Sequence, residues 1–96
     1  MTMSAKTFKL EVLTPLKPVY RGEVTSIVVE GTEGSLGVLH GHCPLFTGLK
    51  KGLLKVEEPG EKVFYLTIDG GFMEVKQNQA VVLTESASKK EEATAE

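Results

Sequence analysis

The chain has 96 residues, a length that fits one domain and is short for two. Its 11 basic and 13 acidic side chains are mixed along the sequence and give a net charge of -2, so it lacks the basic surface that binds a nucleic-acid backbone. No apolar run reaches the roughly 18–20 residues of a transmembrane helix, and the N-terminus lacks an apolar signal segment. The single cysteine excludes an internal disulfide and fits a reducing compartment. We therefore expect a cytosolic protein that contacts a membrane only through partners.

The first third of the chain predicts extended structure. Phe8, Leu10 and Val12 alternate with polar residues, which is the pattern of a half-buried strand over residues 7–13. Prolines at positions 15 and 18 then exclude a helix and predict an extended turn. Residues 23–30 are rich in β-branched side chains, which pack well on a sheet, so they predict one long central strand.

The rest of the chain predicts hairpins. Four short segments interrupt the apolar runs, and we interpret them as turns: Lys-Lys-Gly at 50–52, Pro-Gly at 59–60, Asp-Gly-Gly at 69–71 and Gln-Asn-Gln at 77–79. The resulting strands recur every 8–12 residues or so, which indicates an antiparallel sandwich or barrel.

The composition changes near residue 85. The last eleven residues contain no large apolar side chain and cannot form a buried helical face. The sequence therefore predicts a β-sandwich domain at residues 1–85 and a polar, disordered tail at residues 86–96.

Three blocks of sequence carry a family resemblance: LEVLT at 10–14, GTEGSLGVLHGHCPLFT at 31–47 and YLTIDGGFMEVKQNQAVVLT at 65–84. In this order they resemble the N-terminal domain of the epsilon subunit of F-type ATP synthases. The resemblance implies an all-β fold, a two-sheet antiparallel β-sandwich. Full-length members continue into a helical hairpin that restrains ATP hydrolysis. About a dozen residues follow the third block, too few for a stable hairpin in water, so we expect the sandwich without it and without its nucleotide site.

The resemblance also implies a function and a location. It indicates a non-catalytic subunit of the central rotor stalk, which couples the gamma subunit to the membrane c-ring during ion-gradient-driven ATP synthesis and holds no cofactor. The subunit is expected to be peripheral, on the cytoplasmic face of an energy-transducing membrane, most simply a bacterial plasma membrane.

Five residues are candidates for partner contacts under this resemblance. Thr14, His42 and Phe46 match positions near the gamma subunit, whereas Glu33 and Ser35 match the loop that faces the c-ring. Ser35 stands where the family often has an acidic residue, so an ionic contact with the ring would rely on Glu33. The alternatives stay open: Phe46 can fill the core together with its neighbouring leucines, and the loop can be an ordinary solvated one.

Two further readings come from the residues themselves. His40, His42 and Cys43 form H-x-H-C, which could begin a metal site, but no other Cys or His exists to complete it. Cys43 as a nucleophile would need a nearby base, and an adjacent residue in an extended chain points the other way. A free-standing β-sandwich adaptor that binds another protein through its glycine-rich edge is the main alternative to a rotor subunit.

Overall fold

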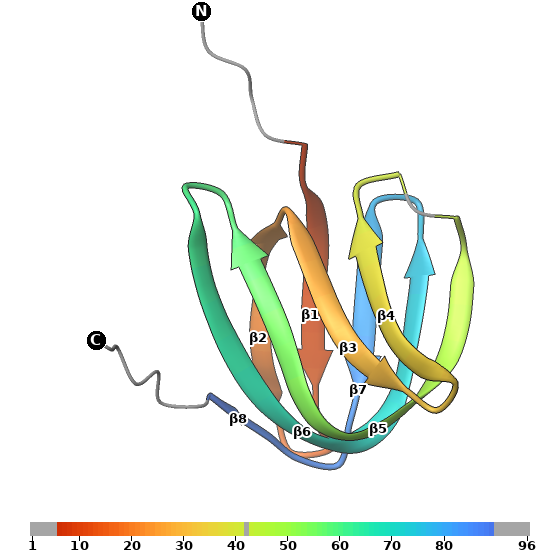
Figure 1. Cartoon of the computed structure of the whole chain (residues 1–96). Coiled ribbons are helices and arrows are strands. Elements are labelled where there is room, and N and C mark those ends of the chain that lie inside the picture. Colours follow the sequence, from red (N-terminus) through yellow and green to blue (C-terminus); the bar gives the residue numbers. More distant parts are fainter. Residues whose placement is uncertain (1–5, 42, 90–96) are drawn as a thin grey trace, which may run out of the picture.

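The computed structural model describes residues 6–41 and 43–89, and these residues form strands, turns and loops without a helix (Figure 1). The eight strands are β1 (Phe8–Leu13), β2 (Pro18–Val24), β3 (Ser26–Gly31), β4 (Gly34–Leu39), β5 (Leu45–Glu58), β6 (Lys62–Lys76), β7 (Gln79–Leu83) and β8 (Ala87–Lys89). The predicted all-β class is confirmed. No helix of the length and hydropathy needed to cross a bilayer occurs in the described part of the chain.

The strands form two packed layers that share two long strands. The hydrogen-bonded order is β2-β1-β7-β6-β5-β3-β4, with β8 paired to β6. The strands β5 and β6 are 14 and 15 residues long, and both bend near their middles, so that each contributes to both layers (Figure 1). Layer one holds β2, β1, β7, the end of β6 and the start of β5. Layer two holds β8, the start of β6, the end of β5, β3 and β4.

The bend in β5 and β6 corrects two of the predicted turns. Lys51 pairs with Asp69 and Leu49 pairs with Gly71, so the two strands run past each other here and neither one reverses. The glycines instead supply curvature. Gly71 has φ 118°, and a Cβ at this position would overlap the carbonyl oxygen of Leu83. The Asp-Gly-Gly segment at 69–71, which has the local sequence of a hairpin turn, therefore forms the bend at which β6 passes from one layer to the other.

Residues 23–30 form two strands rather than the single long strand predicted. The chain leaves layer one at the end of β2 and enters layer two at the start of β3. Thr25 lies at this crossing, and its backbone N–H donates a 2.7 Å hydrogen bond to the carbonyl oxygen of Glu57. The β-branched side chains favour extended backbone, but they do not determine how many sheets that backbone joins.

The strand pairing also departs from the predicted antiparallel pattern at one place. The strands β1 and β7 are parallel, in the register Leu10 with Ala80 and Val12 with Val82. All four of these side chains are fully buried. They alternate with outward-facing residues in the way expected for a strand with one buried face, so the core lies between the two layers.

The start of the predicted tail is structured. Residues 87–89 form β8, which pairs with β6 in the register Ile68 with Ala87 and Leu66 with Lys89. The ammonium group of Lys89 lies 5.0 Å from the centre of the Phe64 ring. The short strand thus covers part of the edge of layer two, and residues 90–96 lie outside the described residues.

Candidate functional site: an exposed aromatic face

One outward-facing surface of layer one is apolar, and we call it the aromatic face. It consists of Leu13, Phe46, Phe72, Val81 and Leu83, with Glu74 among them. The strand register explains why these residues lie together. Phe72 pairs with Leu83, and Glu74 pairs with Phe46 on one side and with Val81 on the other. Paired residues point to the same face of a sheet, so six side chains from four neighbouring strands share one surface.

The aromatic side chains of this face are exposed to an unusual degree. Phe46 is 65% exposed, Phe72 is 51% exposed and Leu83 is 50% exposed. The two phenylalanine rings stack with centroids 5.5 Å apart and planes 13° apart. Stacking covers only one side of each ring, so most of the apolar area remains in contact with water. Contiguous apolar surface of this kind is typical of a protein–protein contact.

A cleft extends the aromatic face toward the bent end of the sandwich. Its volume is about 340 Å³, and its lining is largely apolar: Leu13, Thr14, Pro15, Gly71, Phe72, Leu83, Thr84 and Glu85. Such a cleft can hold an apolar side chain from another molecule. The cleft links the aromatic face to the loop between β1 and β2, where Leu16 is 93% exposed.

The two threonines of the cleft hold its walls in place. The hydroxyl of Thr14 donates a 2.8 Å hydrogen bond to the carbonyl oxygen of Lys17, which closes the turn between β1 and β2. The hydroxyl of Thr84 accepts a 3.1 Å bond from the backbone N–H of Asp69 and donates a 3.1 Å bond to the carbonyl oxygen of Ser86. Because both hydroxyls are bonded within the chain, the cleft has the character of an apolar contact site.

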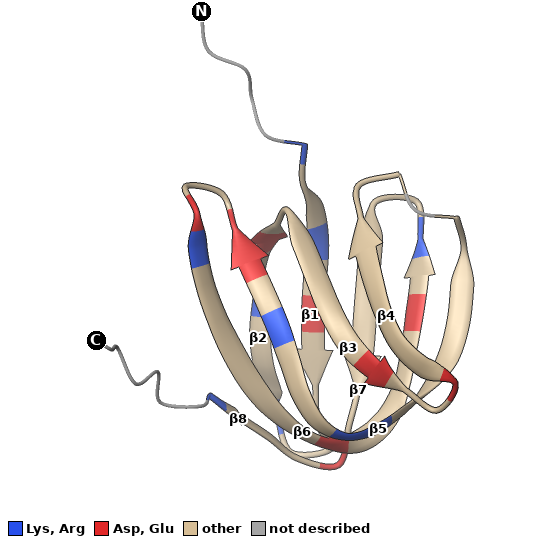
Figure 2. Ribbon diagram, in the orientation of Figure 1, with Lys and Arg blue, Asp and Glu red and all other residues tan. Residues whose placement is uncertain are grey.

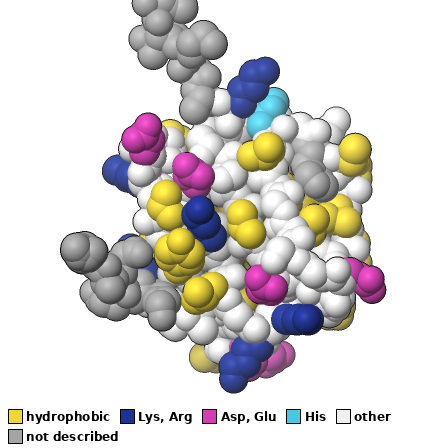
Figure 3. Space-filling view, in the orientation of Figure 1, with side chains coloured by type: hydrophobic (Ala, Val, Ile, Leu, Met, Phe, Trp, Pro, Cys, Tyr) yellow, Lys and Arg dark blue, Asp and Glu magenta, His cyan; other side chains and the backbone are white. Residues whose placement is uncertain are grey.

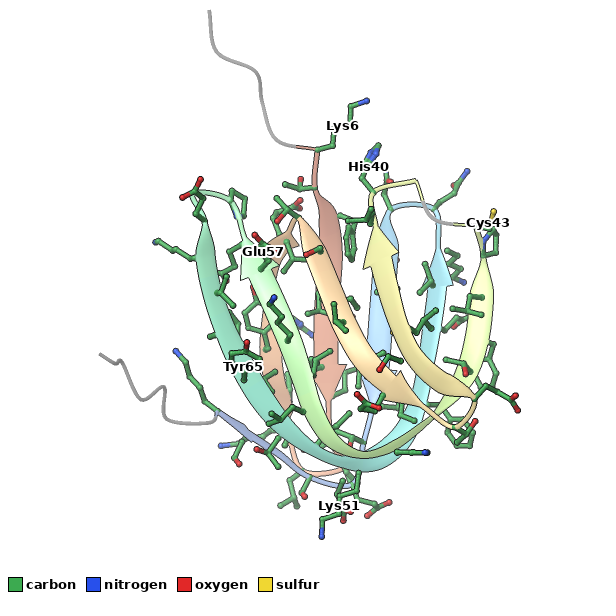
Figure 4. The ribbon with its side chains drawn as sticks, in the orientation of Figure 1. Lys6, His40, Cys43, Lys51, Glu57 and Tyr65 are labelled. Carbon is green, nitrogen blue, oxygen red and sulfur yellow. The ribbon has the colours of Figure 1, made fainter. Side chains whose placement is uncertain are left out.

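The bent end of the sandwich is polar and carries charges of both signs. Acidic and basic positions both occur at this end of the ribbon (Figure 2). Glu33 lies in the turn between β3 and β4. Lys51 lies at the bend of β5 (Figure 4). The hydroxyl of Ser35 donates a 3.0 Å hydrogen bond to the carboxylate of Glu30. Glu33 makes no hydrogen bond or ion pair within the described part of the chain. Its charge is therefore available to a partner.

The structure separates the five residues predicted to make contacts. Phe46 points outward, whereas its neighbour Leu49 is buried, so Phe46 does not fill the core. Thr14 lies near Phe46, because Thr14 and Phe72 line the same cleft and the ring of Phe72 stacks on that of Phe46. Glu33 and Ser35 lie together at the hairpin of β3 and β4. The prediction for His42 falls outside the described residues.

Sequence reasoning missed Phe72 and Leu83. A signal existed for Phe72, because it shares the period-two position of Glu74 and Lys76 and alternates with the buried Met73 and Val75. Leu83 gives no such signal, because it follows a run of apolar residues in β7. Only its pairing with Phe72 places it on the outer face.

The H-x-H-C motif gathers no set of ligands in the described residues. His40 and Cys43 flank the connection between β4 and β5, at the end of the sandwich opposite Lys51 (Figure 4). No three His, Cys, Asp or Glu side chains among the described residues come together in a way that could hold a metal ion. Cys43 is exposed.

The outer face of layer two has a different character. Its hydrophobic side chains are interrupted by charged and polar groups (Figure 3). The side chains of Val28, Leu53 and Val63 are 40%, 41% and 40% exposed. Lys55 lies between them, because it pairs with Val28 on one side and with Tyr65 on the other. The more strongly exposed apolar side chains thus belong to the aromatic face, where Phe46, Phe72 and Leu83 are each at least half exposed.

Comparison with known families identifies the architecture. The family described as "ATP synthase, Delta/Epsilon chain, beta-sandwich domain" matches residues 7–90. The ATP synthase epsilon chain of Pelotomaculum thermopropionicum is 44% identical over 90 residues, which are 94% of this chain and 66% of that one. The ATP synthase epsilon chain of Chlorobium limicola is 40% identical over 88 residues, which are 92% of this chain and 100% of that one.

Solved structures give the same result. A chain in the cryo-EM structure of the Euglena gracilis mitochondrial ATP synthase with OSCP, F1 and c-ring superposes with a TM-score of 0.83 at 27% identity, covering 92% of this chain and 56% of that one. A chain in the Tetrahymena thermophila central stalk and c-ring superposes with a TM-score of 0.72 at 19% identity, covering 91% of this chain and 69% of that one, and shows the shared fold. The present chain thus spans between about half and all of its relatives' lengths.

Proposed function

The chain belongs to the family of ATP synthase delta/epsilon β-sandwich domains, and from this premise we propose that it is a non-catalytic subunit of the central stalk of an F-type ATP synthase. In this role it couples the gamma subunit to the c-ring while the ion gradient drives ATP synthesis. It holds no cofactor of its own. Its place is peripheral, at the cytoplasmic face of an energy-transducing membrane, and it contacts the membrane only through partners.

The aromatic face is the observation that carries this proposal. A rotor subunit must stay attached to the shaft under torque, which requires a large apolar contact on a stiff body. The stacked rings of Phe46 and Phe72 on a close-packed sandwich provide such a contact. We assign this face to the gamma subunit, and the cleft beside Thr14 to an apolar side chain of the same partner.

The bent end of the sandwich supports the second contact. Glu33 and Ser35 are exposed there, and the backbone N–H of Thr32 donates a 3.1 Å hydrogen bond to the carbonyl oxygen of Gly48. Gly48 in turn pairs with Phe72 on the aromatic face. The polar end and the apolar face therefore adjoin, as expected of a part seated in the corner between a shaft and a ring. We assign Glu33 and Ser35 to the c-ring.

A binding measurement tests the gamma contact. The chain is immobilised, and the gamma subunit of the same source is titrated over it by biolayer interferometry. The double variant Phe46→Ser/Phe72→Ser is expected to weaken binding by about thirtyfold or more, because interface energy concentrates in a few aromatic anchors. The matched control, Leu53→Ser/Val63→Ser, removes exposed apolar side chains from layer two and is expected to change binding by less than about threefold.

Two outcomes would contradict the proposal. If the unaltered chain fails to bind gamma while it captures another protein, the free-standing adaptor is the better description. If gamma binds but the layer-two variant weakens it more than the aromatic variant does, the shaft contacts the other layer. Circular dichroism of both variants verifies that each remains folded.

A further inference from the structure

Glu74 is a charged side chain on the aromatic face, at the side of that face where Lys76 follows it two residues later on the same strand. It pairs with Phe46 across one strand boundary and with Val81 across the other, and Phe72 lies two residues before it on the same face. Any partner that covers the stacked rings therefore also covers this carboxylate. The contact between the two proteins cannot be purely apolar.

The side chain of Glu74 has no partner among the described residues, unlike the two other carboxylates on the outer side of layer one. Glu23 accepts a 2.7 Å hydrogen bond from the hydroxyl of Thr7. Glu11 forms a 3.0 Å ion pair with Arg21 at the far edge of the sheet. The side chain of Glu74 forms no ion pair or hydrogen bond with any other described residue. In the free chain its charge is solvated by water, since the side chain is exposed. A partner that lies over the aromatic face removes that water.

Removing water from an unpaired carboxylate is strongly unfavourable, and an apolar partner offers nothing in return. A cation of the partner that lies against the carboxylate makes the contribution of Glu74 to the binding free energy favourable, because opposite charges attract strongly in a contact that contains little water. We propose that the segment of the gamma subunit that covers the aromatic face carries a basic side chain between its apolar ones, and that this cation pairs with Glu74. This inference rests on the proposed assignment of the face to gamma.

The pairing gives the contact a defined position. Phe46, Phe72 and Leu83 present smooth apolar surfaces that tolerate sliding, whereas a charge pair is satisfied at one register only. An arginine suits the site better than a lysine, because its planar guanidinium can lie against an aromatic ring and bind a carboxylate with two N–H groups. Glu74 thus acts as a register and specificity residue within an apolar interface.

The sign of one substitution tests the inference. Glu74→Gln keeps the size of the side chain and removes its charge. If gamma places a cation there, this variant weakens binding by about tenfold or more, and Glu74→Lys weakens it further. If gamma is apolar at that point, Glu74→Gln binds as well as the unaltered chain or more tightly, because a desolvated charge has been removed; this result would overturn the inference.

The experiment uses the full chain and the gamma subunit of the same source, with the dissociation constant measured by biolayer interferometry. Glu57→Gln is the control for net charge, because it makes the same one-unit change on layer two, where Glu57 accepts a 3.1 Å hydrogen bond from Ser26. It is expected to leave the dissociation constant within about twofold of the unaltered value, whereas a loss equal to that of Glu74→Gln would mean that net charge alone governs binding and would also overturn the inference.

The outcome for Glu74 is distinguishable from the outcome for the proposed function. If Phe46→Ser/Phe72→Ser weakens binding and Glu74→Gln does not, the face binds gamma but the charge pair is wrong. If neither variant weakens binding, the gamma assignment fails and the inference fails with it. If both weaken binding and the Glu57→Gln control does not, both stand.

Discussion

The two halves of the β5–β6 pair differ in the exposure of their aromatic side chains. In layer two, the ring of Phe64 lies 5.4 Å from the ring of Tyr20 and under the ammonium group of Lys89. Strands β2 and β8 thus cover it from within the chain. In layer one, the rings of Phe46 and Phe72 stack on each other, and each side chain stays at least half exposed. The same pair of strands, β5 and β6, therefore carries an aromatic side chain that is covered by the chain at one end and aromatic side chains that are exposed at the other.

This difference separates stability from recognition. A side chain that the chain itself covers stabilises the fold, and its truncation lowers the free energy of unfolding. A side chain left uncovered contributes little to the fold and keeps its apolar area for a partner. Three tests, taken from the largest expected effect to the smallest, follow from this difference.

Gly71→Ala disturbs the bend of β6, on which the packing of both layers depends. The residue has a positive φ, and an added Cβ would overlap the carbonyl oxygen of Leu83, which belongs to the backbone and cannot turn aside. We expect a loss of about 3 kcal/mol or more in the free energy of unfolding, measured by urea denaturation. Gly60→Ala is the control, because it also has a positive φ but its Cβ would meet nothing within 4 Å. It should cost only about 1 kcal/mol.

Phe64→Ala and Phe46→Ala compare the two halves directly. Phe64 packs against the core cluster, so its truncation is expected to lower the free energy of unfolding by about 2 kcal/mol. Phe46 is 65% exposed, and its truncation is expected to cost less than about 1 kcal/mol. Urea denaturation of the isolated chain measures both. Equal losses would mean that the aromatic face supports the fold as much as the covered half does.

Tyr20→Phe tests the hydrogen bond that joins the two layers. The phenolic hydroxyl of Tyr20 on β2 donates a 2.5 Å hydrogen bond to the carboxylate of Glu58 at the end of β5. Its removal is expected to lower the free energy of unfolding by about 1 kcal/mol at pH 7. Truncating the whole ring would confuse this hydrogen bond with the contact to Phe64, so the variant keeps the ring.

The same pair predicts a pH dependence. Burial, and then the hydrogen bond and the negative charge of Glu58, raise the pKa of Tyr20 above its ordinary value of 10.0. The folded protein therefore holds the phenolic proton more tightly than the unfolded chain does. Its contribution to stability is complete below about pH 10 and is lost as the pH rises above that value. The stability of the unaltered chain and that of Tyr20→Phe should converge in this range. A constant difference from pH 7 to pH 11 would contradict the assignment.

Local pattern predicted part of this molecule. The alternation of Phe8, Leu10 and Val12 is visible without a structure, because a strand with one buried face must repeat every two residues. The turn at Pro59-Gly60 is confirmed, and the turn predicted at 77–79 lies at 77–78, with Gln79 beginning β7. Reversal of the chain at both places needs only a few residues of suitable conformation. The three sequence blocks sufficed to indicate the family.

The aromatic face was predictable only in part. Phe46 was a candidate for an exposed contact, but its alternative as a core residue was equally consistent with the sequence. Phe72 alternates with the buried Met73 and Val75, so its exposure could have been inferred, whereas Leu83 follows an apolar run and only its pairing with Phe72 places it on the surface. Exposure of an apolar side chain depends on which strands lie over it, and these strands are distant in the sequence.

The sequence by itself thus determined that the chain is extended, where its simplest turns lie and to which family it belongs, because these properties follow from neighbouring residues and from motif order. Only the tertiary structure decided that Asp-Gly-Gly at 69–71 bends a strand and does not reverse it, and that Thr25 carries the chain from one layer to the other. It also decided which phenylalanines are covered. These outcomes depend on pairing between distant segments, where one carbonyl oxygen, that of Leu83, fixes what Gly71 must be.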